Sequence, residues 1–215
     1  MNKSALINKR SLEDQAADLI REDIVNGELT PGTRLVETSL AKEYGLSRGT
    51  IRIALHQLGT ESLITQVPYA GWSVAQLTGQ DLWELSTLRT TLEGMAARLA
   101  AEHITAAGAE QLKAVYADLL ECCAGEDFNA ITRADLALHK AIVDLSGHGR
   151  LARQYQLIEN QLLSYISVSN QSFDPAVVGS SHRALVDAIC EGRVDDAAAE
   201  AVHSITDAEQ LQQVL

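Results

Sequence analysis

Residues 31–58 read PGTRLVETSLAKEYGLSRGTIRIALHQL, and this stretch decides the fold of the N-terminal part of the chain. Its first half predicts a short helix from about Glu37 to Tyr44 that ends at Gly45. Ser47 is a favourable N-cap for the helix that follows, in which apolar residues recur at helical spacing. Two short helices joined by a turn that contains glycine are typical of a helix-turn-helix.

The residues on either side of this stretch complete a winged helix. Upstream, a helix is predicted from its N-cap Ser11 to the Asn-Gly stop signal at 26–27. Downstream, the β-prone runs 63–67 and 72–74 flank a Pro/Gly turn, which predicts a hairpin. We therefore expect residues 1–76 to form a winged helix-turn-helix domain that binds DNA. A three-helix domain without a role in DNA binding is the alternative.

Charge is divided unevenly along the chain. The net charge is −12 at pH 7, which by itself argues against a nucleic-acid partner. Residues 1–76 hold eight basic and nine acidic residues, whereas residues 77–215 hold nine basic and 20 acidic residues. Almost all of the excess negative charge therefore belongs to the C-terminal part, and a small site for a polyanion near the N-terminus remains compatible with the composition.

The overall composition excludes several classes of protein. Hydrophobic residues make up 46% of the chain and charged residues 21%, as in ordinary globular proteins. The sequence has no run of 18 apolar residues and no signal-peptide h-region at its N-terminus, so we expect a soluble, cytoplasmic protein without a membrane partner. Cys122, Cys123 and Cys190 form no CxxC motif, which argues against a disulfide framework or a cysteine-based zinc finger.

Three arginines are the candidate DNA contacts. Arg48 lies at the start of the second helix of the helix-turn-helix and Arg52 lies one turn later, so both share the part of the helix that meets base edges. Arginine binds phosphate or guanine through two hydrogen bonds. Arg34, just before the first short helix, is in reach of the phosphate backbone. The alternative to a role in DNA binding is that each arginine is solvated or paired with an acidic side chain.

From Thr78 onward the sequence predicts an all-α bundle that occupies residues 77–215. Thr78 and Asp81 have the spacing of a capping box. Short breaks, of which Gly108 is the first, separate the predicted helices. These helices lie at about 79–102, 108–124, 128–146, 150–170, 176–191 and 195–213.

Arg89 lies on the apolar face of the first of these helices. Because a buried charge without a partner costs several kcal/mol, its guanidinium needs an anion. Glu93, one turn further on, is one candidate for that anion. A bound carboxylate ligand is the other.

One carboxylate and three imidazoles point to a metal site inside the bundle. Asp135 and His139 share a helix face with apolar residues, and His182 and His203 lie on two later helices. A single histidine on an apolar face is usually a core residue, but four such groups on three helices match the ligand set of a divalent ion. We expect zinc, with nickel, manganese or iron as alternatives, and coordination positions left for water or an incoming acid.

Motifs in the N-terminal part resemble the GntR family of bacterial transcription regulators. They are PGTRLVE at 31–37 and LAKEYGLSR at 40–48. The resemblance implies a winged helix that binds palindromic operator DNA as a homodimer. It also implies four DNA-contacting residues, which are Arg34, Arg48, Arg52 and Gly71. The chain departs from the family where it carries Gly49-Thr50 in place of Thr-Pro and Ile53 in place of an acid.

The C-terminal part is similar to the FCD effector domain of the FadR-like branch of that family. The similar motifs are LRTTLEGMAARLA at 88–100, DLALH at 135–139 and SHRAL at 181–185. The similarity implies that a small carboxylate effector completes the shell of a divalent metal, with Arg89 as a partner of the effector. The implied metal ligands are Asp135, His139, His182 and His203.

These features predict a ligand-responsive transcription regulator that acts as a repressor. They do not predict an enzyme. Two alternatives stay open. The metal itself can be the signal, which would make the protein a metal sensor, or the metal can activate water in an enzyme. A hydrolase also needs a placed acid or base, and no HExxH or GxSxG motif is present.

Overall fold

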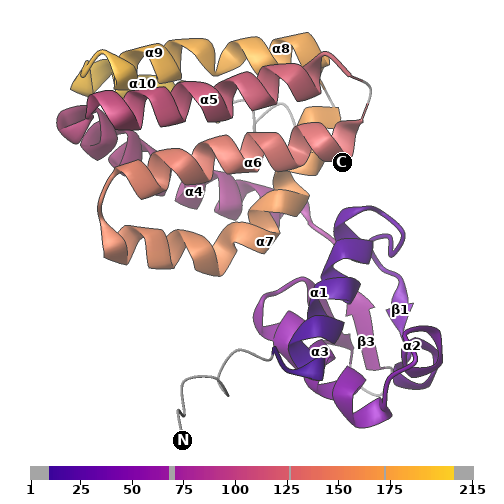
Figure 1. The fold of residues 1–215 in the computed structure, drawn as a ribbon. Helices are drawn as coiled ribbons and strands as arrows, with labels where there is room; N and C mark the ends of the chain where they lie inside the picture. Colours follow the sequence, from indigo (N-terminus) through magenta and orange to yellow (C-terminus); the bar gives the residue numbers. More distant parts are fainter. Residues whose placement is uncertain (1–9, 68–70, 126, 172, 206–215) are drawn as a thin grey trace, which may run out of the picture. The chain divides into compact units, whose positions relative to one another are not determined.

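The computed structural model describes residues 10–67, 71–125, 127–171 and 173–205 of the chain, which is mainly helical. The chain divides into two compact units, Met1–Gln76 and Leu77–Leu215, and each unit has its own hydrophobic core. Figure 1 shows short helices around a small sheet in the first unit and a bundle of helices in the second. The predicted combination of a winged helix-turn-helix with an all-α bundle is confirmed.

The helices of the N-terminal unit begin where the sequence predicts. They are α1 (Leu12–Val25), α2 (Glu37–Glu43) and α3 (Arg48–Thr60). Ser11 Oγ accepts a hydrogen bond from the Asp14 N–H at 3.0 Å, and Ser47 Oγ accepts one from the Thr50 N–H at 3.1 Å. These two side chains satisfy N–H groups that the first turn of a helix leaves without a backbone partner. The helix-turn-helix is formed by α2 and α3.

A small antiparallel sheet completes this unit. Its strands are β1 (Arg34–Leu35), β2 (Ile64–Val67) and β3 (Gly71–Val74), in the order β1-β3-β2. β2 and β3 form the predicted hairpin, with Ile64 opposite Val74. Residues 68–70 of the predicted turn lie outside the described residues. β1 is an addition to the prediction, because a strand of two residues has no periodicity that a sequence could display.

Trp72 on β3 joins the hairpin to α3. Its side chain is buried, and a Cβ atom added at Gly59 would lie only 2.6 Å from one of its ring carbons. His56 meets the same ring edge-on, with 5.2 Å between the ring centroids. The close approach requires glycine at position 59, and it fixes α3 relative to the sheet.

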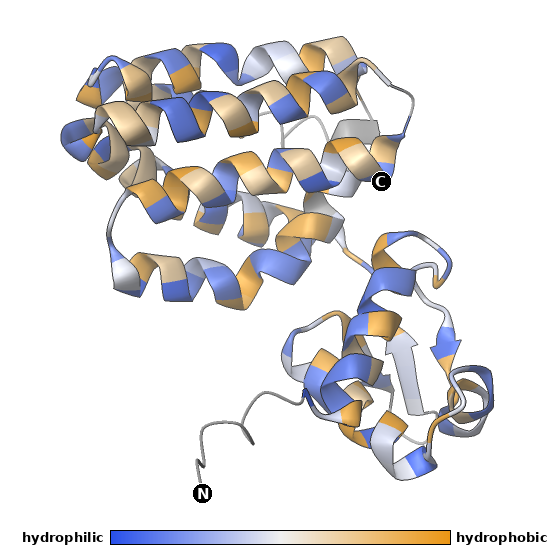
Figure 2. Ribbon diagram, in the orientation of Figure 1, coloured by the Kyte–Doolittle hydropathy of each residue, from blue (hydrophilic) through white to orange (hydrophobic). Residues whose placement is uncertain are grey.

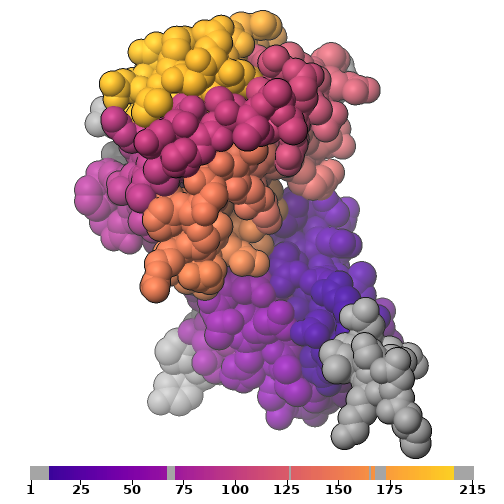
Figure 3. Space-filling view, turned by 60° about the vertical axis from the view of Figure 1, so that its left-hand side comes forward, coloured from indigo at the N-terminus to yellow at the C-terminus, as the bar shows by residue number. Residues whose placement is uncertain are grey.

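The C-terminal unit is a bundle of helices. They are α4 (Gly79–His103), α5 (Ala106–Cys123), α6 (Phe128–Leu145), α7 (Gly149–Gln171), α8 (Pro175–Ser181), α9 (Arg183–Cys190) and α10 (Val194–His203). α6 packs against α5, α7 and α4, while α10 packs along α4 and α9. Polar and apolar residues alternate along these helices (Figure 2), as expected where each helix buries one face. In the space-filling view, α5 lies next to the C-terminal helices, and α7 forms a further band of the surface (Figure 3).

The first helix of the bundle starts at the predicted capping box. Thr78 Oγ1 accepts a hydrogen bond from the Asp81 N–H at 3.2 Å, and the Thr78 N–H donates to Asp81 Oδ2 at 2.8 Å. Among the described residues, no helix is both long enough and apolar enough to cross a lipid bilayer.

Helix boundaries differ from the prediction at three places, two of them before α10. Gly108 does not separate two helices, because Thr105 caps α5 and accepts the Gly108 N–H at 3.1 Å. The predicted helix 176–191 is in fact two helices, α8 and α9, which meet at His182.

The break at His182 has a local cause. In a continuous helix the Val178 carbonyl would accept the backbone N–H of His182. Instead it accepts the Ser181 hydroxyl at 2.9 Å and lies 2.9 Å from His182 Nδ1. The third difference is at the C-terminus, where α10 ends at His203 and residues 206–213 of the predicted helix lie outside the described residues.

Candidate functional site

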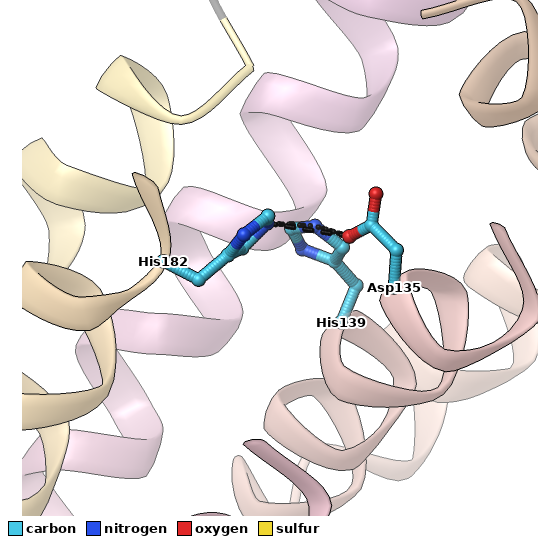
Figure 4. A group of neighbouring side chains, drawn as sticks. All are labelled: Asp135, His139 and His182. Carbon is cyan, nitrogen blue, oxygen red and sulfur yellow. Dashed lines mark hydrogen bonds and ion pairs between the residues drawn. The ribbon is translucent and has the colours of Figure 1, made fainter. Parts of the chain in front are cut away.

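Three polar side chains meet inside the helical bundle. Asp135 and His139 lie one turn apart on α6, and His182 enters from the junction of α8 and α9 (Figure 4). Asp135 Oδ1 lies 3.1 Å from His139 Nε2 and 3.2 Å from His182 Nε2, and the two Nε2 atoms are 3.1 Å apart. All three side chains are buried. Their three atoms form a nearly equilateral triangle, and we call these residues the Asp/His cluster.

The other ring nitrogen of each histidine is bound outside the triangle. His139 Nδ1 lies 2.7 Å from Glu93 Oε2, and His182 Nδ1 lies 2.9 Å from the Val178 carbonyl oxygen. Because a carboxylate and a carbonyl can only accept, both Nδ1 atoms carry a proton. In the neutral rings both Nε2 lone pairs then face each other and Asp135. Three acceptors in this arrangement are stable only with a cation among them, either a metal ion or an additional proton.

The Asp/His cluster fits a divalent transition metal. Ligands about 2.1–2.2 Å from one ion, at neighbouring octahedral positions, are separated by about 3.1 Å, as the three cluster atoms are. Two imidazoles and one carboxylate on one side of an ion leave coordination positions open. A histidine that binds metal also typically donates its second N–H to a carboxylate or carbonyl. When bound, the ion would supply positive charge and sites for a further ligand.

Glu93 connects the Asp/His cluster to two more side chains. Its Oε1 accepts hydrogen bonds from Arg89 Nε and from the Tyr155 hydroxyl, both at 2.8 Å, and its Oε2 is the partner of His139 Nδ1. Arg89, Glu93, His139 and Tyr155 are each 4% exposed or less. One carboxylate therefore ties α4 to both α6 and α7 in the interior of the bundle.

Burial and neighbouring charges set the protonation of this network. Burial works to raise the pKa of Glu93, but Arg89 and His139 outweigh it and lower that pKa to about 2. Burial also opposes the charge of Asp135, yet His182 and His139 hold its pKa well below the usual range. Burial and Arg89 depress the pKa of His139, while Glu93 and Asp135 raise it, and the balance is upward. Both carboxylates are therefore ionised at neutral pH, as metal ligands and ion-pair partners must be.

A cavity of about 300 Å³ opens beside the cluster. This volume lies at the lower end of the range for sites that bind small molecules. The wall includes Arg89 and the three cluster residues as well as apolar Ile166 and Phe173. A ligand in the cavity would therefore meet a guanidinium and the Asp/His cluster at once.

The structure brings together three of the four predicted metal ligands, the members of the Asp/His cluster. His203 is exposed at the end of α10 and lines the same cavity, but it does not belong to the group whose ligand atoms lie within 4.8 Å of one another. Arg89 forms an ion pair with Glu93, and it also lines the cavity in which a carboxylate ligand would lie. Sequence reasoning missed Tyr155 and the contact of His139 with Glu93. The spacing of Arg89 and Glu93 predicted the ion pair between them but not the other partners of Glu93.

The predicted DNA contacts lie on exposed surface of the N-terminal unit. Arg48 and Arg52 are exposed on α3, and both lie near Glu37 of α2. Arg34 is exposed on β1. Gly71 begins β3 with a φ of +93°, in the left-handed region that favours glycine. These four residues stay predicted DNA contacts.

Two family models match consecutive parts of the chain. The model "Bacterial regulatory proteins, gntR family" matches residues 12–74, and the model "FCD domain" matches residues 84–207. The chain belongs to the gntR family. It is a DNA-binding transcription regulator with an FCD domain and not an enzyme, so the metal-dependent enzyme considered above is excluded.

Relatives of this gntR-family regulator cover most of its length. The probable D-xylose utilization operon transcriptional repressor of Paenarthrobacter nicotinovorans is 26% identical over 88% of this chain and 83% of its own. The uncharacterized regulator YdhC of Bacillus subtilis is 31% identical over 72% of this chain and 69% of its own. Among solved structures, McbR/YncC of Escherichia coli has a TM-score of 0.78 at 21% identity, with 96% of this chain and 99% of its own covered. A putative GntR regulator from Rhodococcus sp. RHA1 has a TM-score of 0.80 at 21% identity, with 96% and 100% covered. At these identities the two structures support the fold alone.

Proposed function

We propose that this gntR-family regulator is a repressor whose affinity for operator DNA is controlled by a small carboxylate bound at a divalent metal ion. Asp135, His139 and His182 would hold the ion, with His203 as a fourth candidate ligand from the cavity wall. The observation that carries this proposal is the triangle of three acceptor atoms beside a cavity. Zinc is our first choice, and nickel, manganese or iron suit the same donors.

The chemistry of the cavity favours an anion as the effector. A small carboxylate would meet the charge of the ion on one side and the Arg89 guanidinium on the other. Burial opposes the charge of Arg89, but Glu93, Tyr155 and Asp135 together outweigh it and raise the Arg89 pKa, so the guanidinium stays charged. The apolar side chains Ile166 and Phe173 would cover the hydrocarbon part of a short organic acid.

Repression and dimer formation are inferred from the family. The P. nicotinovorans relative is described as a probable repressor, and the E. coli relative GlaR, 35% identical over 38% of this chain, is described as a repressor. A palindromic operator presents two equal half-sites, which a homodimer matches by symmetry. The effector changes operator affinity only if it binds more tightly to one arrangement of the DNA-binding domains, and we propose that this arrangement releases the operator.

Metal binding is tested by isothermal titration of the full chain, stripped with a chelator, against Zn²⁺, Ni²⁺ and Mn²⁺. We expect one ion per chain, and a more than tenfold weaker affinity in His182→Ala, roughly the effect of disturbing a ligand shell. His103→Ala is the matched control, because His103 is an exposed imidazole at the end of α4. A wild-type chain that binds none of the three ions, or a His182→Ala variant that binds them as tightly, contradicts the proposal.

Effector control is tested by fluorescence anisotropy with operator DNA selected from a pool of random palindromes. The metal-loaded protein should bind the operator more weakly in the presence of an effective small acid, and Arg89→Met should lose that response while it still binds the operator. If the ion alone changes operator affinity and no acid does, the protein is a metal sensor instead. Unchanged affinity across all acids and all three metals rules out both forms of control.

A further inference from the structure

Glu37 lies between the two arginines on the exposed face of α3. It is the first residue of α2, and its Oε1 accepts a hydrogen bond from Arg52 Nε at 2.9 Å. Its Oε2 accepts one from a terminal nitrogen of Arg52 at 2.8 Å and lies 3.8 Å from a terminal nitrogen of Arg48. Arg52 is 53% exposed and Glu37 is 23% exposed. The contact thus joins the two helices of the helix-turn-helix on their solvent side.

The geometry of this contact decides what Arg52 can still bind. A guanidinium has five N–H groups in one plane. Glu37 takes the pair on the Nε side, which leaves the N–H groups on the terminal side, two of them parallel. Two parallel N–H groups match the O6 and N7 acceptors that guanine presents in the major groove. The carboxylate therefore does not compete with a guanine for Arg52 but holds the side chain in an orientation that suits one.

We propose that Glu37 is a positioning residue for sequence recognition, which fixes Arg52 so that it reads a single guanine in each half-site of the operator. This inference rests on the proposed role of Arg52 as a DNA contact and adds the residue that directs it. Ordered in advance, the Arg52 side chain loses less conformational entropy on binding the correct base. Glu37 also places a negative charge close to the DNA-facing side, which weakens attraction to phosphates of any sequence.

Both effects act in the same direction on specificity. Removal of the Glu37 charge should strengthen binding to unrelated DNA and weaken the preference for the correct guanine. A residue that only stabilised α2 would leave the relative affinities for operator, guanine-substituted operator and unrelated DNA unchanged. Its replacement would alter the folded fraction of the protein and not the choice among sequences. The ratio of affinities for matched and mismatched DNA is therefore the informative measurement.

The test compares Glu37→Gln with the matched control Glu43→Gln in the full chain. Glu43 is exposed at the end of the same helix and forms no ion pair among the described residues, so the control removes the same charge without touching Arg52. Affinities are measured for the selected operator, for variants with each guanine replaced by 7-deazaguanine, which lacks the N7 acceptor, and for unrelated DNA. Arg52→Ala and the double variant with Glu37→Gln complete a double-mutant cycle. Melting temperatures verify that every variant is folded.

We expect wild-type protein and Glu43→Gln to lose about tenfold in affinity when one particular guanine is replaced, the typical size of one bidentate base contact. Glu37→Gln should lose most of that discrimination. In the Arg52→Ala background, Glu37→Gln should cause no further loss of discrimination at this guanine. If Glu37→Gln discriminates as sharply as Glu43→Gln at every guanine, Glu37 does not position Arg52. If Arg52→Ala itself leaves discrimination unchanged, the proposed DNA contact fails instead, and the two failures are distinguishable.

Discussion

The molecule contains two arginine–glutamate pairs of equal contact distance in opposite surroundings. Arg52–Glu37 in the N-terminal unit and Arg89–Glu93 in the C-terminal unit both have a nitrogen–oxygen distance of 2.8 Å. The side chains of the first pair are 53% and 23% exposed, and those of the second are 5% and 3% exposed. Distance alone therefore says little about what each pair contributes.

Surroundings determine whether each pair can take on a further partner. Water and salt screen the exposed pair, so Arg52 can meet a base or phosphate at little expense. Solvent has little access to the buried pair to replace a lost partner, and Glu93 also contacts Tyr155 and His139. The DNA-binding unit thus keeps its charges available to a partner, whereas the FCD unit uses its charges to hold three helices in one arrangement.

Breaking the buried pair should have the largest effect on stability. Glu93→Ala leaves the guanidinium of Arg89 buried without its main partner, and we expect the FCD unit to lose about 3–5 kcal/mol of unfolding free energy. Urea unfolding of the metal-free protein, followed by circular dichroism, measures the loss. Glu102→Ala, an exposed site on the same helix, is the control. Equal stability of the two variants would remove the distinction drawn between the pairs. Should Glu93→Ala not fold, Glu93→Gln provides the same comparison.

An intermediate effect is expected from Tyr155→Phe, which removes one donor to the Glu93 carboxylate. A hydrogen bond to a charged group contributes about 1.5–3 kcal/mol, whereas one to a neutral acceptor contributes about 1 kcal/mol. Tyr116 offers a matched comparison, because its buried hydroxyl donates to the Gly179 carbonyl at 3.0 Å. Tyr155→Phe should therefore shift the urea midpoint further than Tyr116→Phe. The reverse order would mean that Glu93 does not need its third partner.

The smallest change in stability is expected from Glu37→Gln, despite the double hydrogen bond that it weakens. Exposed ion pairs contribute little to folding and are screened by salt. Any difference in melting temperature from wild type at low salt should vanish at 1 M NaCl, whereas the deficit of Glu93→Ala should persist there. A deficit of Glu37→Gln that survives high salt would show that this pair stabilises the fold.

Much of the fold follows from local signals in the sequence. Ser11, Ser47 and the Thr78–Asp81 capping box mark helix starts, because capping depends on residues three apart in the chain. The break at His182 escaped prediction because apolar spacing continues across it, while its cause is the competition of two side chains for one carbonyl oxygen. Gly108 was predicted to separate two helices, but it lies inside the first turn of α5. Glycine is compatible with a first turn that a side chain caps, as Thr105 does here.

The candidate site was predictable in part. Asp135 and His139 are four residues apart on a strongly amphipathic helix, so their shared inward face could be derived from the sequence. That His182 joins them, and that His203 lies apart from them, depends on how separate helices pack. Tyr155 gave no signal at all, because a buried tyrosine on an apolar face is ordinary until its hydroxyl is placed beside a carboxylate.

His182 is at once the end of α8, the start of α9 and a member of the Asp/His cluster. Because side chains bind the Val178 carbonyl, this carbonyl makes no helical hydrogen bond to the His182 backbone. α8 is only seven residues long and contributes Val177 and Val178 to the cavity wall. A movement of α8 about His182 would change the length of the cavity without displacing the Asp/His cluster. Related regulators with the same bundle could then bind acids of different length at the same cluster.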